Sequence, residues 1–327
     1  MRESQFVKQH TARWQEFENL SIGRTGTNPD KLADLFIQLT DDLSYARTNY
    51  PDSKTTQYLN NLTAKVHQSI YKNRREKSNR LITFWTHELP LVFYSTRKQL
   101  LYAFVIFGLA TMIGVISTAY DEDFARSFLG DGYINMTIEN IKNGDPMAVY
   151  KDTSGWAMFL SIPWHNMKVA GFTFLAGVFC FSWYLLVQNG IMLGTFQFFF
   201  YKYGLLASSA SVIWIHGTLE ISCIVIAGCA GLVIGNSILF PGTYARMESF
   251  KTGAIRGLKI YLSILPLLLM AGFLESYITR LTDMPLWGKL MIIISSAIFI
   301  VWYYIVYPVW VHRKTQINIP KTIKATI

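Results

Sequence analysis

Charged residues are scarce in this chain of 327 residues. They make up 16% of it, well below the roughly 25% that is typical of soluble domains. Hydrophobic residues make up 51% and aromatic residues 15%. A surface with so few charges is solvated by lipid, and Tyr and Trp side chains are enriched where a protein crosses the headgroup layer. The composition therefore predicts an integral membrane protein.

Cysteine is equally scarce. The three cysteines, Cys180, Cys223 and Cys229, all lie in apolar runs, where a thiol behaves as a small hydrophobic group. The sequence therefore contains no disulfide framework and no cysteine-based metal motif. The net charge of +9 is not accompanied by a zinc-finger or RNA-recognition motif. Anionic lipid explains the sign of the charge, and nucleic acid is not expected as a partner.

The first 97 residues have a different character from the rest of the chain. Residues 1–98 contain 15 of the 30 Lys and Arg and 10 of the 21 Asp and Glu. They show no secretory signal, because the first apolar run begins only near Leu100. Apolar residues recur at helical spacing in three stretches of residues 1–75, the second starting at Pro29 and the third after Pro51. Residues 1–97 are predicted to be a basic, helical cytoplasmic region.

A basic cluster closes this region, immediately before an aromatic segment at residues 81–94. The combination is typical of a helix that lies in the headgroup layer, where each basic residue near anionic lipid contributes about 1 kcal/mol. The alternative is a solvated linker that merely follows the positive-inside rule. The predicted lipid-facing basic residues are Lys72, Arg74, Arg75, Lys77 and Arg80.

The remaining chain is predicted to be an all-α, polytopic bundle of about six transmembrane helices at residues 98–312, followed by a cytoplasmic tail at 313–327. A run of about 20 apolar residues is long enough to cross the hydrocarbon. Such runs occupy residues 100–120, 169–187, 260–277 and 290–311. Residues 189–240 are long enough for two crossings, the second bent near Gly217. The sequence leaves open whether 190–203 crosses or is re-entrant.

Loop charges predict the orientation of these spans. Residues 121–152 carry seven acids and three bases, whereas residues 241–259 carry four bases and one acid. Under the positive-inside rule the first loop is outside and the second is cytoplasmic. The basic tail after residue 311 then places the carboxyl terminus on the cytoplasmic side, together with the amino terminus.

Three ionisable residues stand out inside the apolar runs. His216 and Glu220 are one helical turn apart, and Glu275 belongs to another span. An ionisable group at bilayer depth costs several kcal/mol and needs a partner or a function. Three interpretations remain open: a buried contact that fixes helix packing, a relay or headgroup site in transport, and a metal site with these three residues as ligands. No catalytic residue is assigned.

Small residues follow this cluster. They predict close helix packing in the small-xxx-small style, although glycine is also simply common in membrane helices. The residues assigned to helix packing are Gly217, Gly228, Gly231 and Gly235.

The stretch 166–280 resembles the stage II sporulation protein M family of polytopic bacterial and archaeal membrane proteins. The matching segments are NGIMLG at 189–194, HGTLEI at 216–221, IAGCAGL at 226–232, FPG at 240–242 and GFLES at 272–276. The resemblance implies the fold and a multi-pass location in the bacterial inner (cytoplasmic) membrane. The family's namesake is a membrane scaffold for cell-wall-cleaving partners. The long amino-terminal region and the acidic outer loop depart from the namesake and point to the non-sporulation branch.

The preferred function is therefore a membrane scaffold or assembly protein in cell-envelope processes. The alternatives are a transporter or lipid-handling protein that uses the His/Glu cluster, and an intramembrane metalloenzyme. The expected partners are membrane lipids, other envelope proteins such as cell-wall hydrolase complexes, and a second copy of the chain. No cofactor is expected, with zinc as the exception if the cluster binds metal. A tightly packed, dry cluster favours the scaffold, and a cavity at the cluster favours transport.

Overall fold

The computed structural model describes residues 1–22, 29–71, 80–143, 155–281 and 284–317. These residues form helices joined by turns, with no strand among them. The predicted all-α fold is therefore confirmed. The chain divides into two compact units, Met1–Arg80 and Leu81–Ile327, and each is described by itself.

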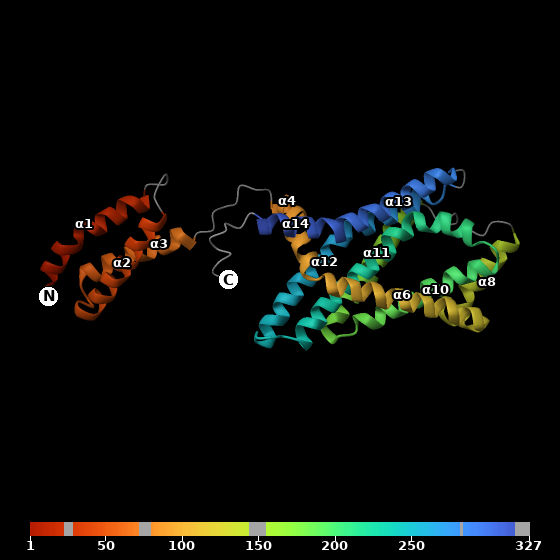
Figure 1. Cartoon of the computed structure of the whole chain (residues 1–327), viewed down its shortest axis with the longest axis horizontal. Helices are drawn as coiled ribbons and strands as arrows, with labels where there is room; N and C mark the ends of the chain where they lie inside the picture. The colour runs from red at the N-terminus through yellow and green to blue at the C-terminus, as the bar shows by residue number, and fades with distance from the viewer. Residues whose placement is uncertain (23–28, 72–79, 144–154, 282–283, 318–327) are drawn as a thin grey trace. The chain divides into compact units, whose positions relative to one another are not determined.

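The first unit consists of three helices, α1 (Glu3–Ile22), α2 (Pro29–Asn49) and α3 (Lys54–Tyr71) (Figure 1). They begin where the helical spacing of apolar residues and the two prolines predicted. Their apolar faces pack together in one core, and each fully buried large side chain contributes about 1.5 to 3 kcal/mol. The core residues are Phe6, Trp14, Phe17, Leu35, Leu39, Leu43, Ala46, Leu59 and Leu62.

A buried acid ties α1 to α2 within this unit. Asp42 is only 6% exposed, and its carboxylate accepts hydrogen bonds from Arg13 Nη2 at 2.6 and 2.8 Å and from Trp14 Nε1 at 2.8 Å. A buried carboxylate is tolerated when its oxygens are satisfied in this way. The contact fixes the relative register of the two helices.

The second unit opens with three short elements, α4 (Arg80–Thr83), the π-turn η1 (Phe84–Glu88) and α5 (Leu89–Ser95). The phenol groups of two tyrosines near the end of the chain donate hydrogen bonds to carbonyl oxygens of η1, Tyr303 to Trp85 at 2.8 Å and Tyr307 to Thr86 at 3.1 Å. The predicted headgroup-layer segment therefore packs against membrane helices of its own chain.

Six helical segments then run back and forth through the unit. They are α6 (Arg97–Tyr120), α9 (Gly155–Leu175), α10 (Ser182–Lys202), α11 (Leu206–Leu239), α12 (Arg246–Phe273) with η4 (Leu274–Ile278), and α13 (Leu286–Val301) with η5 (Trp302–Val306) and α14 (Tyr307–Ile317) (Figure 1). The segments containing α6, α11, α12 and α13 are long and apolar enough to cross a membrane. Four such helices and the all-helical packing confirm a helical membrane bundle. Crossings by α9 and α10, of 21 residues each, stay a prediction.

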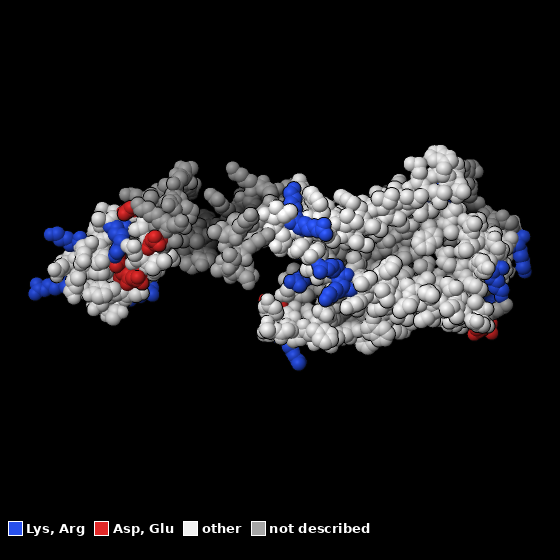
Figure 2. Space-filling model, in the orientation of Figure 1, with Lys and Arg blue, Asp and Glu red and all other residues white. Residues whose placement is uncertain are grey.

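The acidic loop after α6 contains two short helices, α7 (Glu122–Leu129) and α8 (Asp131–Lys142). Asp121 caps α7 by accepting a hydrogen bond from the amide of Asp123 at 3.0 Å, and Arg126 pairs with Asp131 at 2.8 Å. Figure 2 shows Lys and Arg gathered at the two ends of the second unit, with a surface free of them in between. That distribution is expected when the middle of the bundle faces hydrocarbon.

The predicted span at residues 169–187 is wrong in its bounds. The chain is helical from Gly155 to Leu175, turns through η3 (Ala176–Phe179) and Cys180, and starts α10 at Ser182. Cys180 has a left-handed φ of 60°, and the Ser182 hydroxyl donates a hydrogen bond to the Thr173 carbonyl oxygen at 2.6 Å. The turn consists of apolar residues, so hydropathy could not locate it.

The corrected bounds of α9 and α10 also show to which helices the neighbouring segments belong. Residues 156–164 belong to the first half of α9, and residues 190–202 form the carboxyl-terminal part of the continuous helix α10. The helix α11 continues without a break past Gly217 for 34 residues in all, and the bend expected there stays a prediction.

The helix α11 forms the centre of the unit. Within its most apolar window 61% of the residues are buried, compared with 6% for the segment Leu286–Ile317. It packs against α6, α9, α10, α12 and α13. Its approach to η3 is especially close, since a Cβ added to Gly177 would lie 2.6 Å from Gly231 Cα. Small residues permit such contacts between membrane helices.

The orientation in the membrane is testable by cysteine labelling. The loop charges predict that Lys142, at the end of α8, faces outside and that Lys251, in α12, faces the cytoplasm. We expect a cysteine at position 142 to react with a membrane-impermeant maleimide in intact cells, and one at 251 to react only after permeabilisation. A background without Cys180 provides the control. The opposite pattern would contradict the orientation.

Candidate functional site

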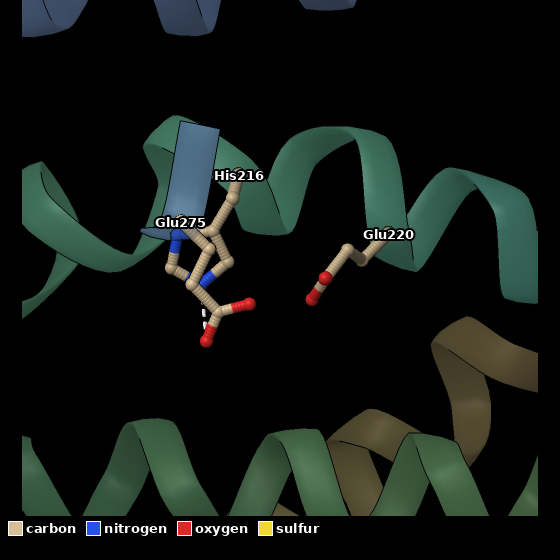
Figure 3. A group of neighbouring side chains, drawn as sticks. All are labelled: His216, Glu220 and Glu275. Carbon is tan, nitrogen blue, oxygen red and sulfur yellow. Dashed lines mark ion pairs between the residues drawn. The ribbon is translucent and has the colours of Figure 1, made fainter. Parts of the chain in front are cut away.

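The three ionisable residues singled out in the sequence converge in one cluster. His216 and Glu220 extend from the same face of α11, and Glu275 extends from η4 toward them (Figure 3). One ligand atom from each residue can be chosen so that all three atoms lie within 4.8 Å of one another. The helices α11 and α12 are packed side by side, which brings together residues about 55 positions apart in the chain.

His216 is held on both sides of its ring. Its Nδ1 atom lies 3.0 Å from Thr279 Oγ1, and its Nε2 atom lies 3.9 Å from Glu275 Oε1. The contact with Thr279 is a hydrogen bond, whereas the separation from Glu275 is too long for one. The imidazole is 4% exposed, so Thr279 fixes a buried ring and leaves Nε2 directed toward the carboxyl group.

Glu220 has a partner that the sequence analysis did not assign. The Asn166 amide on α9 donates a hydrogen bond to Glu220 Oε1 at 2.5 Å. A carboxylate oxygen of Glu220 and one of Glu275 also lie within 4.8 Å of each other. The available signal was an amide, Asn166, in a mainly apolar stretch, but nothing in the sequence showed which helices α9 contacts.

The position of Glu275 depends on a local irregularity in the helix. In η4 the amide of Thr279 bonds to the carbonyl oxygen of Leu274, five residues earlier, at 2.8 Å. This π-turn follows the end of α12, contains Glu275 and is capped by Thr279, and these are the two residues that contact His216. Single π-turns of this kind occur frequently at functional sites.

The cluster borders a pocket of about 350 Å³. Glu220, Glu275 and Asn166 line it together with three residues from the same stretch of α9, namely Ser161, Ile162 and His165. Ser161 and His165 are exposed, whereas His216 and Thr279 are buried. One side of the cluster therefore borders an open hollow, while His216 and Thr279 are packed among the helices.

The four predicted packing glycines differ in their surroundings. A Cβ on Gly228 would overlap the Leu186 side chain, and one on Gly231 would overlap Ser182 and approach the Thr173 carbonyl oxygen to 2.6 Å. Gly235 has ordinary spacing to Gly177 and Cys180, and Gly217 faces only Ile213 of its own helix, at 3.8 Å. Of these four glycines, Gly228 and Gly231 are thus the ones with no room for a side chain.

Most of the predicted lipid-facing residues lie outside the described part of the chain. This applies to Lys72, Arg74, Arg75 and Lys77. Arg80 is described, and it is exposed at the start of α4.

The fold and the site together define a polytopic helical membrane protein with a carboxyl-lined pocket beside its central helix α11. The family model described as stage II sporulation protein M matches residues 103–280. This match covers more than half of the chain, so the chain belongs to the stage II sporulation protein M family. The matched region begins well before the predicted core of 166–280 and includes the acidic loop.

The amino-terminal unit matches a second family model. Residues 4–72 match a domain of unknown function (DUF8413), which coincides with the three-helix unit α1 to α3. No curated protein and no solved structure matches the chain.

Proposed function

We propose that this protein binds a small cationic or polar solute in the pocket beside Glu220 and Glu275, as a step in moving or handling that solute in the membrane. The observation that carries the proposal is the pocket itself. A contact that only fixes helix packing would fill its space with side chains, whereas here two carboxyl groups and an amide line a hollow of about 350 Å³.

The electrostatics of the cluster favour a cationic ligand. Two carboxylates a few Å apart in a medium of low dielectric can both be ionised only if a positive charge lies beside them. Without such a charge, one of them takes up a proton. Among the described residues that line the pocket there is no Lys or Arg. A cation bound beside Glu220 and Glu275 would supply the positive charge that compensates them. Ser161 and His165 are exposed and line the pocket, so a solute would enter past these side chains.

A scaffold or assembly role in the cell envelope is the second candidate. Membership of the stage II sporulation protein M family supports it, as does the separate helical unit at Met1–Arg80. The segment Leu286–Ile317, with 6% of its apolar window buried, leaves a surface for lipid, for another envelope protein such as a cell-wall hydrolase complex, or for a second copy of the chain. A scaffold would retain its function without the carboxyl groups of the pocket, provided that it still folds.

A transport and binding assay separates the two candidates. We expect the full-length protein in liposomes to take up or bind members of a panel of inorganic cations, amines and zwitterionic solutes. Glu220→Gln and Glu275→Gln remove charge with little change in shape and should reduce the signal by about tenfold or more, the value of one lost charged contact. Glu248→Gln, an exposed acid at the start of α12, is the matched control. Wild-type activity in both pocket variants, with intact folding, would favour the scaffold.

A further inference from the structure

We infer that the pocket holds a divalent transition-metal ion of the zinc class, with His216, Glu220 and Glu275 as its protein ligands. The inference rests on the proposed function and names the chemical class of the ligand. It starts from the donor set, because one imidazole nitrogen and two carboxylate oxygens form a mixed set that suits zinc and similar ions. Magnesium and calcium prefer oxygen ligands alone.

The distances within the cluster fit an ion between the donors. Zinc bonds to nitrogen and oxygen are about 2.0 to 2.2 Å long, so two ligands of one tetrahedral ion lie about 3.3 to 3.6 Å apart. The separation of His216 Nε2 and Glu275 Oε1 is 3.9 Å, too long for a hydrogen bond and within a few tenths of an ångström of that spacing. All three donor atoms lie within 4.8 Å of one another. Side-chain rotations that shift these atoms by about 1 Å would bring all three to bonding distance from one ion.

The residues around the donors orient them as metal ligands are usually oriented. Metal-binding histidines generally use their second ring nitrogen for a hydrogen bond that fixes the ring. Thr279 Oγ1, 3.0 Å from His216 Nδ1, occupies that position and directs Nε2 toward the carboxyl groups. On the other side, Asn166 holds one oxygen of Glu220 at 2.5 Å, which leaves the second oxygen for an ion.

Three protein ligands leave the fourth position of a tetrahedral ion to be filled from the pocket. Sites of this kind keep one exchangeable ligand, whereas sites with four protein ligands are structural. Glu220 and Glu275 line the pocket, and the buried His216 lies next to Glu275, with its Nε2 atom 3.9 Å from Glu275 Oε1. An ion bound here could therefore exchange with the pocket, as a transported or handled cation must.

Metal binding to the full-length protein tests the inference. The protein is purified in detergent without a histidine tag, stripped with chelator and titrated with Zn²⁺ by calorimetry, with the metal content measured by mass spectrometry. We expect one ion per chain and a loss of affinity of at least about tenfold in His216→Ala and in Glu275→Gln. The matched controls, His87→Ala and Glu248→Gln, change exposed residues outside the pocket and should bind like the wild type.

Thr279→Val separates positioning from folding. It removes the hydroxyl that orients His216 and should weaken Zn²⁺ binding by about 10- to 100-fold. It should also alter the visible absorption of bound Co²⁺, which a purely structural role would not change. No bound metal in the folded wild-type protein, or equal affinity in wild type, His216→Ala and Glu275→Gln, would overturn the inference.

The outcomes distinguish this inference from the proposed function. Saturable Zn²⁺ binding that depends on the three ligands, without uptake of any solute, would support the metal site and contradict transport. Uptake of an amine or a zwitterion that depends on Glu220 and Glu275, without Zn²⁺ binding, would support the proposed function and overturn the metal site.

Discussion

His216→Ala and Glu275→Ala should each lower the stability of the metal-free protein, and the double variant should lose less than the sum of the two losses. Their side chains are 5% and 14% exposed, so removing one group leaves the other stranded in a medium of low dielectric. The cost is about 1 to 3 kcal/mol for a neutral polar group and about 3 to 5 kcal/mol for a charged one. Thermal unfolding in detergent with chelator present, followed by tryptophan fluorescence, measures these changes.

The same cycle identifies which carboxyl group His216 contacts. His216 and Glu220 are one helical turn apart on α11, but the structure pairs His216 with Glu275 and Glu220 with Asn166. We therefore expect the larger coupling energy for His216 with Glu275 and a smaller one for His216 with Glu220. Strict additivity in the first pair would show that the two side chains do not interact.

Gly231→Ala should destabilise the membrane unit by about 3 kcal/mol, near the upper end of the range for an overpacked core. The new methyl group would overlap the Ser182 hydroxyl and lie 2.6 Å from the Thr173 carbonyl oxygen. A side chain can rotate away, but the carbonyl belongs to the backbone of α9. Relief therefore requires α9 and α11 to separate. The expected result is a lower unfolding temperature and a smaller monodisperse fraction in detergent.

Gly108→Ala is the matched control for this prediction. A Cβ at position 108 in α6 meets no atom within 4 Å, so the substitution should be neutral or slightly stabilising, by up to about 1 kcal/mol. If Gly231→Ala were as stable as Gly108→Ala, the close contact between α9 and α11 would be contradicted.

Length, hydropathy and helical spacing predicted much of the fold. The 21-residue run without charge became all of α6 after its first three residues, and the stripes around Phe6 and Leu39 became the core of the first unit. These features are local, because a lipid-facing or core-facing helix face must be apolar wherever its neighbours lie. The turn at residues 176–181 was not predicted, because it depends on a contact between two helices and not on a local pattern. It consists of apolar residues, and a hydrogen bond between Ser182 and Thr173 stabilises it.

The candidate site divides along the same line. The sequence alone determined that His216, Glu220 and Glu275 require partners, because an ionisable group in an apolar run is costly in any packing arrangement. It also determined the helices that carry them. The tertiary structure decided that Glu275 and Thr279 contact His216, that Asn166 contacts Glu220, and that a pocket adjoins them. Those contacts depend on the π-turn η4 and on which helices are neighbours, and long-range packing sets both.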